Sequence, residues 1–258
     1  MEQNYNEIQA IRSTQIKAYA NGGLRGLWEC TYGNDDSTTP SLQFGSMAHL
    51  RALCSEKWEA EVLVESIDRR TKEGKARAAE IEASGKIVVK PEEADKIERM
   101  ALEWNKAVVP ILGGSFKTEQ VFVSEIDGVR IKAQIDAISN DNKIVVDYKS
   151  ISDITQAERE IWKRRYDLQL GHYTNSISGS TTEGEFQVYL VFVETGSPYR
   201  RRVFDLTATL NQTRPESFEL AKNCDSALKT FGSDLNLWPQ PGITVIEKIP
   251  DWVRVSVD

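Results

Sequence analysis

The segment from Val129 to Ser150, VRIKAQIDAISNDNKIVVDYKS, decides how the rest of the chain is interpreted. It holds two runs rich in valine and isoleucine, residues 129–138 and 143–148, on either side of the polar turn Asn140-Asp141-Asn142. A similar run, KTEQVFV at residues 117–123, precedes them. Short β-branched runs separated by polar turns are typical of β-hairpins. The segment therefore predicts three consecutive strands that are antiparallel neighbours.

This hairpin is expected to bring three ionisable side chains to one end of the sheet. Asp136 lies near the open end of one strand, and Asp147 and Lys149 lie at the matching end of the next. Side chains alternate along a strand, so Asp147 and Lys149 share a face, whereas Val146 and Tyr148 point to the other. Converging carboxylates repel each other, and a shared proton or a divalent cation relieves that repulsion. The alternative is a surface hairpin with a solvated Asp/Lys pair.

Outward from the hairpin, the apolar pattern becomes mostly helical. Helices are expected at residues 8–20, 46–64, 91–109, 155–177 and 215–231, and further strands at 186–194 and 201–206. The charged stretch from Asp68 to Lys86 is expected to be a solvated helix or a mobile loop. This order predicts an α/β (α+β) fold with a mixed central β-sheet flanked by helices and a helical N-terminal third.

Length and composition favour an ordinary globular protein. The chain has 258 residues, of which 40% are hydrophobic, and 32 basic against 39 acidic side chains give a net charge of −7. Without repeats or long linkers, we expect a single domain over residues 1–258, with a helical part at 1–110, a core at 111–210 and a C-terminal helix and tail at 211–258. No apolar run approaches the roughly 20 residues that cross a bilayer, so we expect a cytoplasmic protein without membrane contact.

Two function classes are disfavoured by the same counts. The three cysteines are widely separated, which excludes a disulfide framework and the spacing of zinc or iron–sulfur sites. The acidic net charge argues against a protein that coats nucleic acid by bulk charge. It is still compatible with a local basic groove beside a carboxylate site.

The order of motifs resembles the PD-(D/E)xK nuclease superfamily. An aspartate in one strand is followed by Asp147-Tyr148-Lys149 in the next and by QLGHY, residues 169–173, in a helix; this Q-x-x-x-Y element is typical of RecB- and RecE-like branches. Upstream, YNEIQAIRSTQIKAYAN (residues 5–21) and LQFGSMAHLRAL (residues 42–53) resemble the start of RecE-type, exodeoxyribonuclease VIII-like phage proteins. The resemblance covers about residues 5–195. Ile135 stands where the superfamily name has a proline.

The resemblance implies a role for each matching residue. Asp136 and Asp147 would be Mg²⁺ ligands, with the Tyr148 carbonyl as a further ligand, and Lys149 would position or activate the attacking water. Hard oxygen ligands suit Mg²⁺ or Mn²⁺, and the implied chemistry is metal-assisted attack on a phosphodiester. His49, in the context Gly45-Ser46-x-x-His49, would be an additional residue of the metal site.

Four residues have both a functional and a structural interpretation. His49 borders the apolar stripe of its predicted helix, so it is either a site residue or a buried structural histidine. Gln169 and Tyr173 lie one helical turn apart and so present side by side. They either hydrogen-bond the nucleic-acid backbone or brace the lysine, or they are generic polar residues of the helix. Glu119 either completes the metal shell or is an exposed strand carboxylate. His172 has no such support and is assigned to the helix surface or to packing.

Basic residues occur in three clusters: residues 163–165, residues 200–202, and the charged stretch that holds Arg69, Arg70, Lys72, Lys75 and Arg77. Each is solvated surface when taken alone. Together, with Trp162 and Tyr199 adjacent to two of them, they are compatible with a groove that contacts phosphates.

The resemblance implies a Mg²⁺-dependent exonuclease that degrades linear double-stranded DNA from 5′ to 3′ and leaves 3′ tails for a single-strand annealing recombination protein. It also implies a ring-shaped homo-oligomer and a phage or prophage origin. The alternatives are a RecB/Cas4-like nuclease of other polarity, a catalytically silent DNA-end-binding module, and a metal-free structural protein.

Overall fold

The computed structural model describes residues 5–33 and 39–239. The helices are α1 (Ser13–Tyr32), α2 (Pro40–Leu53), α3 (Ser55–Glu61), α4 (Lys72–Ser84), α5 (Pro91–Leu112), α6 (Ala157–Lys163), α7 (Tyr166–Ser178) and α8 (Leu210–Phe231). The strands are β1 (Ile11–Arg12), β2 (Val62–Val64), β3 (Ile87–Val89), β4 (Lys117–Ile126), β5 (Val129–Ile138), β6 (Ile144–Ile151), β7 (Gln187–Glu194) and β8 (Arg201–Asp205). Of the C-terminal part predicted at 211–258, residues 240–258 lie outside the described residues.

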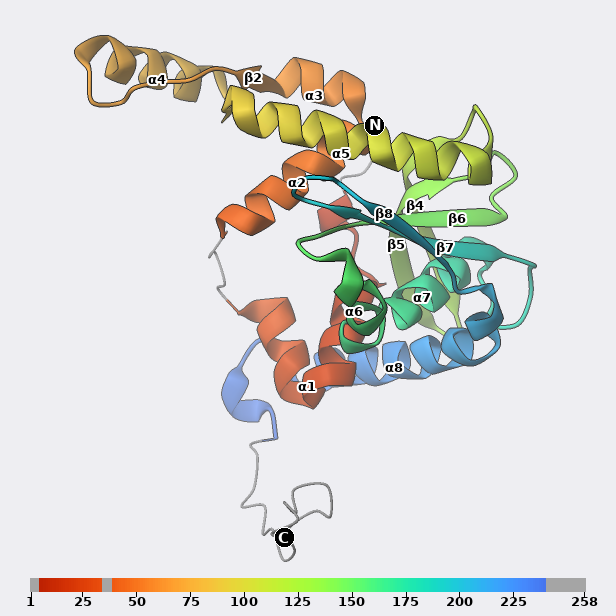
Figure 1. Cartoon of the computed structure of the whole chain (residues 1–258). Coiled ribbons are helices and arrows are strands. Elements are labelled where there is room, and N and C mark those ends of the chain that lie inside the picture. Colours follow the sequence, from red (N-terminus) through yellow and green to blue (C-terminus); the bar gives the residue numbers. More distant parts are fainter. Residues whose placement is uncertain (1–4, 34–38, 240–258) are drawn as a thin grey trace, which may run out of the picture.

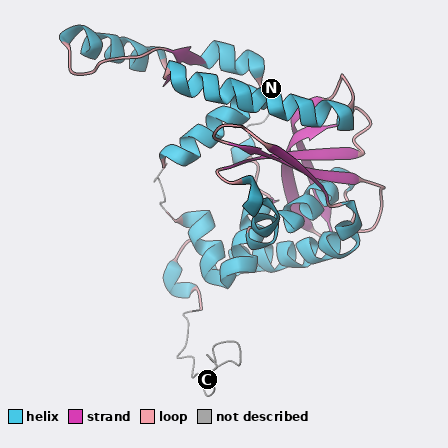
Figure 2. Cartoon of the chain, in the orientation of Figure 1, coloured by secondary structure: helices cyan, strands magenta, loops and turns pink. Residues whose placement is uncertain are grey.

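A mixed six-stranded sheet forms the centre of the molecule, with helices around it (Figure 1, Figure 2). Its strand order is β1-β5-β6-β7-β8, and β4 pairs with β5 along the other edge of that strand. The predicted hairpins are confirmed: β4, β5 and β6 are consecutive antiparallel neighbours. Strand β7 runs parallel to β6 because α6 and α7 carry the chain back across the sheet.

Three apolar clusters attach the helices to this sheet. One joins α2 and α5 to β6 and β7 around the fully buried Trp104. A second places α6 and α7 against β5, β6 and β7 around Leu170 and Phe192. The third joins α1 and α8 around Ile16 and Phe218. Burial of these side chains, at about 25 cal/mol per Å² of apolar surface, fixes the helices that carry the site.

Helix α5 shows why the N-terminal third folds as predicted. Pro91 occupies its first turn with Glu92 and Glu93, where a missing N–H is tolerated and carboxylates face the positive end of the helix dipole. Its buried residues recur at helical spacing, from Ile97 through Trp104 to Val108. The helix ends at Leu112, three residues later than expected.

The predicted helix at residues 46–64 is wrong in extent. It begins at Pro40, because the Thr39 side chain accepts a hydrogen bond from the Leu42 N–H and proline suits the first helical position. It ends at Leu53, since Cys54 has the non-helical angles φ −135° and ψ 64°. Helix α3 and strand β2 then occupy the remainder.

Two other predicted helices also have different limits. The first begins at Ser13 rather than at residue 8, because Ile11 and Arg12 pair with β5, and it continues to Tyr32. The predicted helix at 155–177 is divided into α6 and α7, since Arg165 adopts a left-handed φ of 53°.

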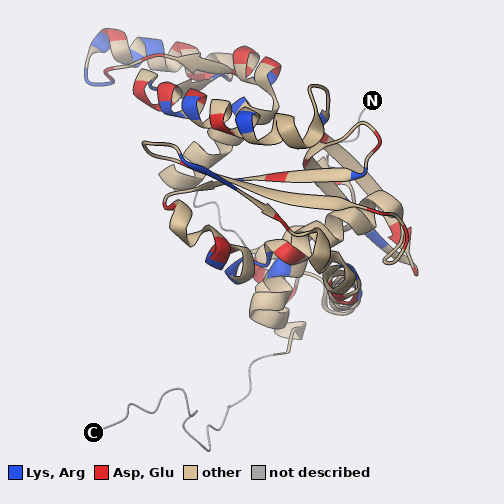
Figure 3. Ribbon diagram, turned by 45° about the vertical axis from the view of Figure 1, so that its right-hand side comes forward, with Lys and Arg blue, Asp and Glu red and all other residues tan. Residues whose placement is uncertain are grey.

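The charged stretch from residue 68 to 86 is largely helical. Helix α4 lies with β2, β3 and α3 in an arm that extends from the body (Figure 1), and residues of both charges occur along it (Figure 3). Most of these charged residues are exposed. Across the described ranges, no helix combines the length and apolarity that spanning a bilayer requires.

Candidate active site

The site lies where β5 and β6 separate. Their antiparallel pairing is limited to Ala137 with Val146 and Ile138 with Val145. The next position in this register would place Asp136 opposite Asp147. Instead of a strand bond, the Asp136 carboxylate accepts the Tyr148 N–H at 2.7 Å. The two strands therefore diverge with both carboxylates in the gap, as the hairpin pattern predicted.

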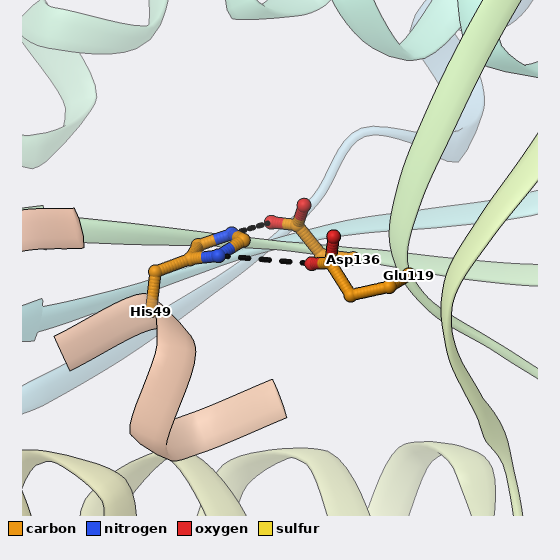
Figure 4. Close-up of side chains that lie close together, drawn as sticks. All are labelled: His49, Glu119 and Asp136. Carbon is orange, nitrogen blue, oxygen red and sulfur yellow. Dashed lines mark ion pairs between the residues drawn. The ribbon is translucent and has the colours of Figure 1, made fainter. Parts of the chain in front are cut away.

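Helix α2 places His49 beside this gap. A Cβ on Gly45 would lie 3.0 Å from the Ser150 Oγ, so the glycine lets the helix approach β6 closely. His49 lies one turn later on the same helical face. Its Nε2 lies 3.1 Å from the Asp136 Oδ2, and its Nδ1 lies 3.7 Å from the Glu119 Oε1 (Figure 4).

Glu119 reaches the same point from the opposite strand. In the register of β4 with β5, it falls opposite Asp136, and its backbone adopts a left-handed φ of 53°. One carboxylate oxygen accepts the Gln134 amide, whereas the buried Oε1 has no hydrogen-bond partner among the described residues. An orphaned buried oxygen of this kind is costly unless a ligand satisfies it.

His49, Glu119 and Asp136 together have the donor set of a divalent metal site. Each offers one ligand atom, and these atoms all lie within 4.8 Å of one another. Two carboxylates and one imidazole suit Mg²⁺ or Mn²⁺. The orphaned Glu119 oxygen and the convergent charge fit such an ion, so these residues are compatible with the implied metal.

The charges of this cluster reinforce one another. Burial lowers the pKa of His49, but the charge and hydrogen bond of Asp136, with Glu119, outweigh burial and raise it overall. Burial and then the Asp136 charge raise the pKa of Glu119. Burial raises the pKa of Asp136, but His49 and Lys149 reverse this and hold it below its ordinary value. The cluster thus favours cations.

Asp147 lies beside this cluster in different surroundings. Its side chain is fully buried and forms an ion pair with Lys149 through Oδ2. Its Oδ1 accepts the Gln169 amide at 2.8 Å and lies 3.4 Å from the Tyr173 hydroxyl. The Gln169 amide also reaches that hydroxyl at 2.6 Å. All four residues selected from the sequence therefore meet at one point.

Burial and charge set the protonation of this second group. Burial and the Asp136 charge raise the pKa of Asp147, and Lys149 opposes them. Burial lowers the pKa of Lys149, but the charges of Asp147 and Asp136 outweigh it and hold that pKa above its ordinary value. Lys149 is consequently a cation at neutral pH.

A cleft of about 620 Å³ opens beside the site and is lined by His49, Lys149, Arg164 and Tyr166 among others. A second cleft of about 370 Å³, between α1 and the start of α7, shares Arg164 and Tyr166 with the first. Lys17, which also lines this second cleft, was missed by sequence reasoning. No periodicity or motif spacing connects α1 to α7.

Two other sequence assignments change with the structure. His172 is buried, at 1% exposure, and its Nε2 donates to the Lys132 carbonyl, so the packing interpretation is confirmed and the helix-surface one is wrong. The basic clusters are largely neutralised by nearby carboxylates. The ion pairs are Arg164–Glu160, Arg165–Asp167, Arg200–Glu194, Arg201–Glu103, Arg202–Glu158, Arg69–Glu82, Arg70–Asp68 and Arg77–Glu65.

A solved structure shares this fold. A "Putative exonuclease" from Eubacterium rectale is 12% identical, with a TM-score of 0.53, over 86% of this chain and 88% of its own. A phage related exonuclease from Haemophilus somnus 129PT is 16% identical, with a TM-score of 0.32, over 52% of this chain and 73% of its own. Among curated proteins no match is found.

A family model covers most of the chain. Residues 12–229 match the PDDEXK-like domain of unknown function (DUF3799). The matched region includes the strand gap, His49 and the helix that carries Gln169. The chain therefore belongs to this family of PDDEXK-like domains and has a PDDEXK-like nuclease fold.

Proposed function

We propose that the chain is a Mg²⁺-dependent exodeoxyribonuclease that shortens linear double-stranded DNA. The observation that carries this proposal is the convergence of Asp136, Asp147 and Lys149 with His49 and Glu119 at the gap between β5 and β6. An aspartate pair and a lysine on diverging strands are the residues that the superfamily motif requires. Membership of a PDDEXK-like family supports the same chemistry.

The metal site is assigned to Asp136, Asp147, His49 and Glu119, with the Tyr148 carbonyl as a further ligand. The Tyr148 N–H points towards β5, and a strand residue directs its N–H and C=O to the same edge, so that carbonyl faces the gap. When bound, a divalent cation supplies positive charge to the phosphodiester and lowers the pKa of a water towards neutrality. Mn²⁺ is expected to substitute for Mg²⁺.

The protein groups supply orientation. Lys149 is protonated and carries an ammonium beside Asp147, so it orients the attacking water or a phosphate oxygen rather than accepting a proton. Gln169 and Tyr173 hold Asp147 in place by hydrogen bonds. Tyr166 lines the adjacent cleft, where the bases of a nucleic-acid strand would meet an aromatic face.

The finer properties follow the resemblance to RecE-type proteins. We propose 5′-to-3′ degradation that leaves 3′ tails, a ring-shaped homo-oligomer that encloses the duplex, and handover of the tail to a single-strand annealing protein. A RecB/Cas4-like nuclease would differ in polarity, and a DNA-end-binding module would not cleave.

Digestion of linear duplexes labelled at either the 5′ or the 3′ end tests the proposal, with Mg²⁺ or with EDTA. We expect Mg²⁺-dependent release of nucleotides from the 5′ label and resistance of covalently closed circles. Release from the 3′ label first would favour the other polarity. Rapid cutting of closed circles would indicate an endonuclease, and end binding without cleavage would indicate the silent module.

A further inference from the structure

Lys17 of α1 lies partly buried beside the site and forms no ion pair with a carboxylate of the described residues, although the charge of Asp147 acts on it from a distance. Its ammonium donates to the Gln169 Oε1 and lies 5.0 Å from the centre of the Tyr166 ring. Within residues 5–33 and 39–239, no ion pair joins it to an acidic side chain. Burial and the charge of Lys149 lower its pKa to about 8. Partial burial of an ammonium costs free energy that its contacts must offset, and its hydrogen-bond partner is Gln169.

Gln169 bridges a cation and an anion. Its Oε1 accepts from Lys17, and its Nε2 donates to the Asp147 Oδ1 at 2.8 Å and to the Tyr173 hydroxyl at 2.6 Å. An ammonium can only donate and a carboxylate can only accept. Turning the amide over would set its carbonyl against the carboxylate and its NH₂ against the ammonium. Lys17 therefore fixes which end of the amide faces Asp147.

We propose that Lys17 is a positioning residue that fixes the Gln169 amide and, through it, the orientation of the Asp147 carboxylate in the metal site. The proposal rests on the proposed function, because it takes Asp147 as a ligand. Lys149 binds the Oδ2 of Asp147 directly, whereas the Oδ1 depends on Gln169. Partners one step outside a metal shell orient its ligands, and their loss typically weakens metal binding by about 10- to 100-fold.

Two other roles for Lys17 make opposite predictions. If Lys17 acted only as a nearby positive charge, its removal would tighten the binding of a divalent cation. If it contacted substrate phosphate in the cleft of about 370 Å³, its removal would leave cation binding alone and weaken DNA binding. A positioning role predicts weaker cation binding despite the loss of a positive charge. The sign of the change therefore separates the three.

Titration of Mn²⁺ into the wild type, Lys17→Met and Lys163→Met tests the sign of the change in Mn²⁺ affinity. Lys163 lines the same cleft, is 65% exposed and contacts Glu160, so its variant removes an equal charge away from Gln169. We expect Lys17→Met to weaken Mn²⁺ binding about tenfold and Lys163→Met to leave it within about twofold. Equal or tighter binding by Lys17→Met would overturn the proposal.

Folding is not expected to confound this comparison. Methionine is similar in length and apolar, and replacing a partly buried charge that has no ion-pair partner among the described residues by an apolar side chain is often neutral or stabilising. Lys17→Arg provides a second variant that keeps a donor and a charge. We expect its Mn²⁺ affinity within about threefold of the wild type; a loss as large as that of Lys17→Met would show that side-chain shape matters and would contradict the proposal.

A double-mutant cycle tests whether the effect passes through Gln169. Gln169→Leu removes the bridge, so adding Lys17→Met to it should change Mn²⁺ affinity by less than about twofold. Multiplied effects would show that Lys17 acts independently of Gln169. In DNA digestion, Lys17→Met should lower kcat with little change in KM, whereas a phosphate contact would raise KM.

The Asp136→Asn variant distinguishes failure of this proposal from failure of the proposed function. If Asp136→Asn bound Mn²⁺ like the wild type, the metal site itself would be misassigned. If Asp136→Asn lost Mn²⁺ and Lys17→Met did not weaken it, only the role of Lys17 would be wrong.

Discussion

Asp136 and Asp147 face each other across the strand gap, yet their surroundings differ in kind. The Asp136 side meets His49 and Glu119, which are about one-third and one-quarter exposed. The buried Oε1 of Glu119 has no hydrogen-bond partner among the described residues and lies 3.7 Å from the His49 Nδ1, whereas the Asp147 Oδ2, which also lacks such a partner, is paired with the Lys149 ammonium. The Asp147 side is fully buried, and Lys149 and Gln169 engage its two oxygens. We call Asp136, His49 and Glu119 the open half of the site, because they can accept a ligand. Asp147, Lys149 and Gln169 form the closed half, because the protein itself already neutralises the carboxylate.

This difference separates two tasks that the motif alone does not distinguish. The open half has excess negative charge at neutral pH and gains stability from an added cation. The closed half holds its carboxylate in one orientation by ion pairing and hydrogen bonding. We therefore expect substitutions in the open half to affect function far more than folding, and substitutions in the closed half to affect function and folding together.

Replacement of either aspartate by asparagine should give the largest effect. Both Asp136→Asn and Asp147→Asn should lower DNA cleavage about a thousandfold, because a metal centre contributes several kcal/mol of transition-state stabilisation. Asp136→Asn should lower the free energy of unfolding by about 1 kcal/mol, because the lost ion pair with His49 is only partly offset by relief of repulsion with Glu119. Asp147→Asn should cost about 3 kcal/mol because it leaves the Lys149 ammonium without its partner.

Urea unfolding and single-turnover cleavage of a linear duplex measure the two quantities on each variant. Equal stability losses in both variants would contradict the distinction between the open and closed halves. Wild-type cleavage by either variant would contradict the site.

The second effect concerns the stability of the closed half against acid. Burial lowers the pKa of His172, on the same helix as Gln169, from its ordinary 6.5 to about 4. Between these pH values the unfolded state binds the proton and the folded state does not, so stability falls as pH falls from about 6.5 to 4. The difference of 2.5 units corresponds to about 3 kcal/mol.

His172→Gln, whose amide can still donate to the Lys132 carbonyl, is the matched variant. Urea unfolding at pH 7.5 and at about pH 4.5 should show a smaller loss for this variant than for the wild type. Parallel stability curves for the two proteins would show that His172 is not the responsible group.

The third effect concerns the open half and falls mainly on function. His49→Ala should lower cleavage at least about tenfold and keep the melting temperature within a few degrees, because the imidazole is one-third exposed. Mn²⁺ should change the residual rate differently from Mg²⁺, since an imidazole ligand prefers the softer ion. A stability loss of about 1–3 kcal/mol with normal activity per folded molecule would identify His49 as structural.

The smallest effect concerns how closely α2 approaches the sheet. Gly45→Ala adds a Cβ 3.0 Å from the Ser150 Oγ, which should shift His49 by a few tenths of an ångström and lower cleavage roughly threefold. Ser150→Gly in the same chain should restore the rate, and Gly22→Ala, whose added Cβ meets nothing within 4 Å, should have no effect. A slow double variant would show that another contact places the helix.

Local patterns predicted the hairpin and the carboxylate pair because strand alternation and turn spacing are local properties. The register places Asp136 opposite Asp147, and Lys149 lies on the face that alternation predicted. By contrast, the left-handed backbone of Glu119 and the contact of Lys17 with Gln169, 152 residues apart, depend on tertiary packing. The predicted helix limits were wrong for a related reason. The pairing of β1 with β5 and the end of α2 before Cys54 depend on contacts between segments that are distant in the sequence.

Binding of Mn²⁺ to the wild type and to Asp136→Asn, followed by electron paramagnetic resonance without DNA, tests the central claim most directly. The account predicts saturable binding by the wild type and at least about tenfold weaker binding by Asp136→Asn, with both proteins equally folded. Equal Mn²⁺ affinity in the two proteins would contradict it.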